Sequence, residues 1–315
     1  MTAYIIRRLI QAVIVVFGVT IIVFIILHLL PGGPARALLG PRATPQAIHQ
    51  FIVQNGYNLP LPVQYGRYVW HLLQGNLGYS YHYNQTVNSL LAQDLPKSAL
   101  LVGLSYIVAL VIAVPLGILQ AIRRNKPIDY TVTGAAFIGY SMPVFWLAFL
   151  LILGFAISFH LLPPEGPQGG TVGAVLQQPL GLVLPVATLA IVTVALFSRF
   201  MRSAAIENMV QDYVRTARAK GVSEFSVLFR HVLRNSLIPI ITLIGLSLPA
   251  TLSGAVVTES VFNYPGMGLL FWTSAQNKDF PVLLGFTVVV GAATVVGSLL
   301  ADILYAVADP RVRYT

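Results

Sequence analysis

Long, uninterrupted apolar runs dominate this chain. Six of them reach the roughly 20 residues that an α-helix needs to cross the hydrocarbon core of a bilayer. None alternates like the strands of a membrane barrel, and helices leave no backbone group unsatisfied in lipid. The pattern predicts an all-α integral membrane protein with about six transmembrane helices, at residues 9–30, 98–120, 130–155, 181–200, 236–258 and 282–306.

The polar segment between the first two runs is too long to be a simple connector. Thr44 can cap a helix that starts at Pro45 and stops at Gly56. Two further amphipathic patterns follow, one ending before Gly75 and one over residues 87–95. We therefore divide the chain into three parts: the N-terminus with the first span (1–30), an outer helical segment (31–97), and a core of five spans (98–315) that includes a cytoplasmic loop (201–235).

The basic residues predict the orientation of the spans, because cytoplasmic flanks carry an excess of Lys and Arg. With the N-terminus inside, 14 of the 19 Lys and Arg residues fall on the cytoplasmic side. The outer side keeps only Arg36, Arg42, Arg67, Lys97 and Lys278. Both termini are therefore expected in the cytoplasm.

Composition removes several classes of function. A net charge of +9 is typical of nucleic-acid binding, but the excess of basic residues at the cytoplasmic flanks accounts for it, so lipid and not nucleic acid is the expected contact. The chain has no cysteine, which excludes disulfides and thiolate sites. Its six histidines show no metal-ligand spacing such as H-E-x-x-H, so no metal site is expected. The spans show no pairing of a nucleophile with a base, so no catalytic residue is expected.

The cytoplasmic loop has the most informative local pattern. Residues 212–221 read DYVRTARAKG, which is rich in helix formers and ends on a glycine suited to a left-handed stop. Ser223 can then cap a second helix with Glu224 in its first turn. Ala217 and Ala219 keep the first helix thin, which would let it enter a groove on a partner. The alternative is that the basic residues only anchor the spans at an anionic leaflet.

Several stretches, in order, resemble one family. The loop signature of ABC importer permeases, in its peptide/nickel branch, is similar to residues 216–239, although Thr216 stands where the general motif has a glutamate. The first span resembles that of a B-type dipeptide or oligopeptide permease, with Gly33 in place of the usual aspartate. Similar agreement is found in LPVQYGRYVWHLLQGNLGYSY (61–81), GYSMPVFW (139–146), TESVFNYPGMG (258–268) and DPRVR (309–313).

This resemblance implies the type I fold of ABC importer permeases in the bacterial cytoplasmic membrane. It further implies that the chain pairs with a second six-span permease, a distinct C-type paralogue. Two ABC ATPase subunits, or one fused ATPase, would bind ATP and Mg, so this chain would hold no cofactor, and it has no G-x-x-x-x-G-K-[ST] loop of its own. An extracytoplasmic binding protein would deliver peptides, with nickel and other small solutes left open. The residues expected to couple to the ATPase are Arg215, Thr216, Ala217, Arg218, Ala219, Lys220, Gly221, Ser223 and Glu224.

Candidate pathway residues come from the third and fifth spans. Pro143 removes a helix hydrogen bond and frees a carbonyl, which is tolerable beside a wet cavity or a neighbouring helix. The alternative is a kink that only improves packing. Small hydroxyl side chains in the fifth span are further candidates, although such groups also serve helix packing. The candidates are Tyr140, Ser141, Met142, Pro143, Ser247, Thr251 and Ser253.

The outer end of the fifth span carries a carboxylate, Glu259, beside the turn at Pro265 and Gly266. By resemblance this loop closes the pathway on the outer side, and the alternative is an ordinary interfacial carboxylate.

Two other classes of function compete with the permease. A secondary transporter tends to show inverted repeats and midplane carboxylates, whereas the only acid inside a span is Asp302, near its end. An intramembrane enzyme would need catalytic groups that the spans lack.

Overall fold

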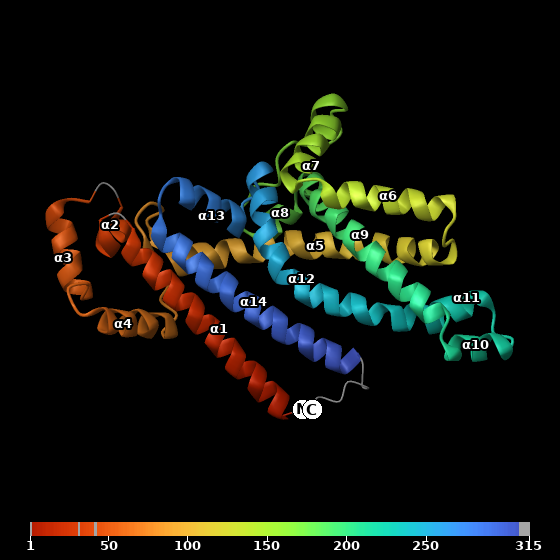
Figure 1. Cartoon of the computed structure of the whole chain (residues 1–315). Helices are drawn as coiled ribbons and strands as arrows, with labels where there is room; N and C mark the ends of the chain where they lie inside the picture. Colours follow the sequence, from red (N-terminus) through yellow and green to blue (C-terminus); the bar gives the residue numbers. More distant parts are fainter. Residues whose placement is uncertain (1, 31, 41–42, 309–315) are drawn as a thin grey trace.

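The computed structural model describes residues 2–30, 32–40 and 43–308, with side chains in these ranges except at 2–9, 12, 242, 246–254 and 298–308. The described chain is almost entirely helical (Figure 1). Its elements are α1 (Thr2–Leu29), α2 (Gly33–Leu39), α3 (Pro45–Asn55), α4 (Leu61–Leu73), β1 (Tyr79–Ser80), β2 (Gln85–Thr86), α5 (Val87–Ile122), α6 (Pro127–Ser141), α7 (Val144–Leu151), the π-helix η1 (Ile152–Ser158), α8 (Val172–Leu176), α9 (Pro179–Met209), α10 (Asp212–Ala219), α11 (Glu224–Ser226), the π-helix η2 (Val227–Val232), α12 (Leu233–Val261), α13 (Met267–Gln276) and α14 (Phe280–Ala308).

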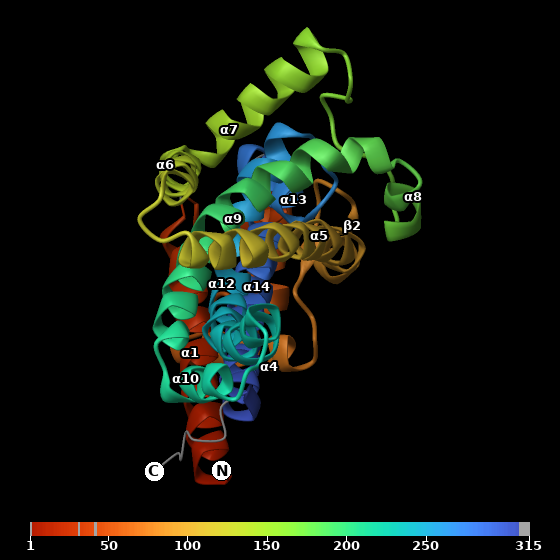
Figure 2. The same ribbon diagram turned by 90° about the vertical axis from the view of Figure 1, so that its right-hand side faces the viewer.

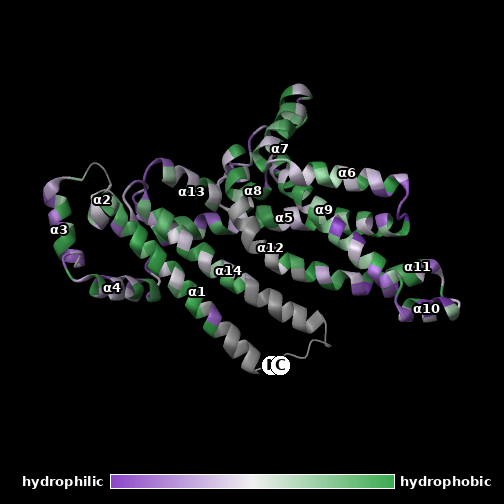
Figure 3. Ribbon diagram, in the orientation of Figure 1, coloured by the Kyte–Doolittle hydropathy of each residue, from purple (hydrophilic) through white to green (hydrophobic). Residues whose placement is uncertain are grey.

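Four helical stretches of the described chain are long and apolar enough to cross a membrane: Val87–Ile122, Pro179–Met209, Glu224–Gly245 and Phe280–Gly297. Two bent helix pairs raise the number to six if each pair counts as one span: Val13–Leu29 with Gly33–Leu39, and Pro127–Ser141 with Val144–Ser158. Hydrophilic residues gather at opposite ends of the molecule, around α3 and around α10 and α11 (Figure 3). The prediction of about six spans is confirmed in this form.

The third predicted span, residues 130–155, is not one kinked helix. The chain bends by 107° between its two halves, α6 and α7. The bend occurs because α6 ends at Ser141 and Pro143, which stands before α7, cannot continue the backbone hydrogen bonds of α6. The second half, α7 and η1, projects beyond α6 (Figure 2), while Ala148 on its inner side packs against Leu184 of α9 and Phe262. Its side chains are mostly exposed, including Trp146 and Phe149. This arm, formed by α7 and η1, therefore has an apolar outer side that no other described part of the chain covers.

The boundary predicted at residue 97 falls inside α5, and the division of the chain at that point stays a prediction. This helix starts at Val87, so the third amphipathic pattern of the outer segment is its first part. Pro96 lies within the helix, which accommodates the one hydrogen bond that a proline removes. The last part of the outer segment and the second span thus form one continuous helix.

The core forms where α5 packs against α9, with α12 beside them (Figure 1). The two helices approach closely: a Cβ added at Gly117 would lie 2.5 Å from the Cβ of Met201. Tyr106 and Phe197 meet edge to face near the middle of the same pair. The central layer is therefore closely packed, and α1 and α14 pack side by side next to it.

The outer segment confirms the helix predicted from Thr44. The hydroxyl of Thr44 accepts a hydrogen bond from the backbone N–H of Ala47, and Gly56 ends α3 with a φ of 71°. A hairpin of β1 and β2, which the sequence pattern did not predict, follows α4. The Ser80 hydroxyl in this hairpin donates to the carboxylate of Asp279, which precedes α14. This contact ties the outer segment to the sixth span.

Candidate functional site

The cytoplasmic helix α10 is amphipathic, and one face packs on its own chain. Val214 and Ala217 are buried against Ala205 of α9 and against Val227 and Val232 of the following helix. Because α10 lies on this small core, its position follows the positions of α9 and η2. Figure 1 places α10 and α11 at one end of the molecule, opposite α3 and α4.

The glycine stop predicted after α10 is confirmed. Gly221 has a φ of 75°, and no atom lies within 4 Å of the place that a Cβ would take. Its left-handed backbone, and not the surrounding space, therefore demands glycine. The predicted cap is confirmed as well, since the hydroxyl of Ser223 accepts from the N–H of Ser226 at 3.4 Å. Arg218 bridges the turn with two hydrogen bonds to Glu224, of 2.8 and 3.1 Å.

The two alanines of α10 have different surroundings, unlike the prediction that both thin the helix for a partner. Ala217 is three residues after Val214 and shares its buried face, so its small size serves packing within the chain. Ala219 is exposed, as are Arg215, Thr216 and Lys220. The surface that α10 offers to a partner is therefore basic with one small apolar position.

An aromatic pair beside this surface was missed in the sequence pattern. Phe225 and Phe229 are 71% and 52% exposed, and their rings pack together with centroids 4.4 Å apart. They are four residues apart on the helical turns after Ser223, so the spacing could have revealed them. Two exposed phenylalanines at a polar end of the molecule indicate a surface that a protein partner covers.

The turn between α5 and α6 is fixed to α9 by an ion pair. Arg202 donates from Nε and Nη2 to the two carboxylate oxygens of Asp129, each at 2.7 Å, and the N–H of Asn125 donates to the same carboxylate. Asp129 is buried. This clamp joins the second cytoplasmic turn to the helix that leads into α10, and it too was missed, because an isolated acid carries no spacing signal.

The candidate pathway residues of the third span lie at its sharp bend. Tyr140 is 52% exposed, Ser141 and Pro143 are also exposed, and Met142 is half-buried. Gly139 beside them packs against Ile191 and Ala195 of α9. The side chains of Ser247, Thr251, Ser253 and Asp302 lie outside the described residues. The role of these residues in a pathway stays a prediction.

Glu259, the predicted outer gate residue, is fully buried and caps a helix that the sequence pattern did not predict. Its Oε2 accepts from the N–H groups of Gly268 and Leu269 at 2.6 and 3.3 Å, at the N-terminus of α13. Its Oε1 accepts from the hydroxyl of Ser98 at 2.6 Å. A carboxylate at this place complements the positive end of the helix. Glu259 therefore holds the start of α13, and its role as an outer gate stays a prediction.

The turn at Pro265 and Gly266 wraps this carboxylate. A Cβ at Gly266 would come within 2.6 Å of both Ser98 and Glu259, and one at Gly268 would lie 2.4 Å from the backbone of Val256. Both glycines are therefore required by close approach and not by φ. Among the described residues, no group of three or more His, Cys, Asp or Glu side chains could hold a metal ion.

Comparison with known proteins shows which family this chain resembles. A model of the family described as "Binding-protein-dependent transport system inner membrane component" matches residues 113–314, and a model of the N-terminal part of that component matches residues 1–102. The chain is 40% identical over 316 residues to the oligopeptide transport system permease protein AppB of Bacillus subtilis (strain 168), covering 100% of both chains. It is 39% identical over 319 residues, again with full coverage, to a protein of Brucella suis biovar 1 (strain 1330) that carries a peptide-permease name.

A solved structure shares the fold. The inward-facing MetNI methionine ABC transporter aligns with a TM-score of 0.54 at 14% identity, covering 70% of this chain and 96% of the other. At this identity the similarity concerns the fold alone.

Proposed function

Since this chain belongs to the family of binding-protein-dependent transport system inner membrane components, we propose that it forms half of the translocation pathway of a peptide importer. It is a multi-pass permease subunit of an ABC importer in the inner membrane. A secondary transporter driven by an ion gradient, the alternative drawn from the sequence, finds no support among these relatives. Peptides are the substrate class because relatives that align over their full length carry peptide-permease names.

The observation that carries the proposal is the surface of α10 and α11. Its inner face is fixed by Val214 and Ala217, and its outer face presents basic side chains beside the exposed rings of Phe225 and Phe229. We assign this outer face to a separate ATPase subunit. Movement of α10 would pass through its small core to α9 and to η2, which continues into α12, and through Arg202 to the turn before α6.

The remaining partners follow from the same division of labour. ATP and Mg belong to the ATPase subunits, and this chain takes no cofactor and performs no catalysis. A second permease, a distinct C-type paralogue, would cover the apolar arm of α7 and η1, where Trp146 and Phe149 are exposed. A binding protein would dock on the outer side, against the outer segment. Glu259 would hold the outer loop closed through α13.

The experiment that tests the proposal is to purify the chain from its native membrane in mild detergent and identify what accompanies it. Stoichiometric ATPase subunits and a second six-span protein are expected. Reconstituted with these partners and the binding protein, the complex should import a radiolabelled peptide only in the presence of ATP. A chain that purifies alone and transports on a proton gradient without ATP would contradict the proposal.

A further inference from the structure

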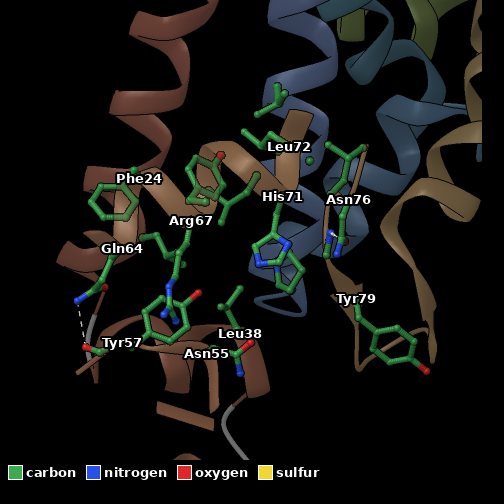
Figure 4. Close-up of a pocket in the computed structure, with 18 of the residues that line it drawn as sticks. Phe24, Leu38, Asn55, Tyr57, Gln64, Arg67, His71, Leu72, Asn76 and Tyr79 are labelled. Atoms are coloured by element: carbon green, nitrogen blue, oxygen red, sulfur yellow. Dashed lines mark hydrogen bonds between the residues drawn. The ribbon is translucent and has the colours of Figure 1, made fainter. Parts of the chain in front are cut away.

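The outer segment encloses a cavity of about 450 Å³ between α1, α3, α4, the hairpin and the start of α14 (Figure 4). This volume lies in the range of small-ligand sites, roughly 300–1,000 Å³. One part of its wall is apolar, with Phe24 and Leu27 from α1, Leu72 from α4, and Leu284 and Val288 from α14. The other part is polar and comes from α3, α4 and the loops that follow them. A ligand held here would have both an apolar and a polar end.

The polar part of the wall carries the positive charge of Arg67 and contains no acid. Arg67 and His71 lie four residues apart on α4 and both line the cavity, whereas no lining residue is Asp or Glu. The whole stretch from residue 31 to 93 contains no acidic residue. In the described structure Arg67 has no ion pair and no side-chain hydrogen bond, although its guanidinium lies over Gly56 at the end of α3. The cavity therefore favours an anion.

Tyrosine hydroxyls supply further donors. The hydroxyl of Tyr68 is buried and has no hydrogen-bond partner in the described structure, although its ring packs near Phe24. Burial raises the pKa of Tyr57 to about 12, and burial together with the neighbouring tyrosines raises the pKa of Tyr68 further, so both hydroxyls stay protonated. A buried hydroxyl without a partner costs free energy, and a ligand oxygen would remove that cost.

We infer that this cavity binds a carboxylate attached to a small apolar or aromatic body, the chemistry of the C-terminal residue of a short peptide. Arg67 would receive the carboxylate, since its planar guanidinium matches two carboxylate oxygens. Tyr68 would donate to the same group, and Phe24 and Leu284 would contact the terminal side chain. The inference rests on the proposed peptide importer and adds a substrate site on the permease itself, outside the pathway.

A phospholipid of the outer leaflet offers the same chemistry, an anion on an apolar body. The peptide is favoured because the polar wall adds neutral donors and acceptors, such as the side chains of Asn55 and Asn76, that suit a peptide backbone better than an acyl chain. The two sources differ in one testable respect. A peptide loses the negative charge of its carboxylate when its C-terminus is amidated, whereas a lipid competes from within the membrane.

The test uses the purified complex without its binding protein, in nanodiscs of phosphatidylcholine alone. Isothermal titration with the tripeptide Ala-Ala-Phe should show saturable binding, and its C-terminal amide should bind at least tenfold more weakly. Arg67→Gln should weaken binding of the free acid at least tenfold. Arg36→Gln is the matched control, because Arg36 is an exposed outer arginine that does not line the cavity, and it should leave binding unchanged.

Tyr68→Phe is a second variant that tests the same cavity if Arg67→Gln disturbs the fold. It removes only the hydroxyl that lacks a partner, so it should weaken binding severalfold without lowering thermal stability. Equal binding of the acid and the amide, or full binding by both variants, would overturn the inference. So would loss of peptide binding in nanodiscs that contain phosphatidylglycerol, because the site would then belong to lipid. ATP-dependent peptide uptake by the same complex is measured in parallel, and its presence would leave the proposed function intact if the cavity inference fails.

Discussion

The hydroxyl of Ser98 donates a hydrogen bond of 2.6 Å to the carboxylate of Glu259, a residue 161 positions later in the chain. Ser98 also accepts from the N–H of Met267, so one hydroxyl joins α5 both to the end of α12 and to the start of α13. The backbone carbonyl of Lys97 accepts from the Tyr264 hydroxyl at 2.8 Å next to it. Three helices on the outer side thus meet at one buried carboxylate, and no water-exposed group takes part.

Glu259→Gln should therefore destabilise the outer side far more than its small change in shape suggests. The carboxylate accepts from three donors with two oxygens, whereas the amide has one oxygen and would turn its NH₂ group toward an N–H or O–H. Leaving a buried donor without an acceptor costs about 1–3 kcal/mol, and the expected result is a lower midpoint of thermal unfolding in detergent. Glu165→Gln, an exposed acid on the outer side, is the control and should leave the midpoint unchanged. An unchanged midpoint for Glu259→Gln would show that the network does not hold α13.

The pair formed by Asp129 and Arg202 allows a second, matched prediction. Its side chains are 3% and 28% exposed, whereas those of Glu224 and Arg218, which pair with the same two-bond geometry, are 65% and 42% exposed. Breaking a buried pair leaves an uncompensated charge at a cost of about 3 kcal/mol, while an exposed pair contributes about 0–1 kcal/mol. Asp129→Asn should therefore lower the unfolding midpoint clearly, and Glu224→Gln should not. Equal shifts for the two variants would contradict this ranking.

The fold was predictable from sequence where it follows from local patterns. Lipid allows only helices in long apolar runs, so the spans could be placed, and the caps at Thr44 and Ser223 follow from side chains that reach their own backbone. The sequence pattern placed Pro143 inside one span, as a pathway candidate or a packing kink, and did not predict the sharp bend found there. A proline shows where backbone hydrogen bonding stops, but the angle of 107° depends on what the next helix packs against, which local sequence does not contain.

The candidate site was likewise predictable where it depends on local sequence, and not where it depends on contacts between distant elements. Gly221 was correctly expected to be left-handed, because the helix pattern ends directly before it. The partners of Glu259 were not predictable, since Ser98 and Gly268 lie on different elements and meet only in the folded chain. The α10 alanines show the same limit. Spacing placed both on a helix, but only the packing of that helix determined which of them faces inward.

Enlarging Ala219 and enlarging Ala217 should therefore have different effects, the first on transport and the second also on stability. Ala219→Leu adds bulk to the exposed face, so the chain should insert and unfold normally but lose ATP-dependent uptake. Ala217→Leu would force a larger side chain into the packed contact with Val214 and Val227, at a cost of about 1–3 kcal/mol, and should lower the unfolding midpoint as well. Uptake at wild-type rates by Ala219→Leu, at equal membrane levels, would remove this face of α10 from the coupling surface.

Phe225 and Phe229 provide the most direct test of the partner surface. Both rings are largely exposed, so replacing both with serine should leave the unfolding midpoint of the purified chain within experimental error. If an ATPase covers them, the same double variant should lose a large part of the ATPase that copurifies with the chain, because exposed aromatic anchors dominate such interfaces. Phe159→Ser is the control: its ring is 67% exposed after η1, on the arm that bends away from the bundle, and it should leave copurification unchanged. Full retention of the ATPase by the double variant would mean that the basic face of α10 alone carries the contact, and that the exposed aromatic pair serves another partner.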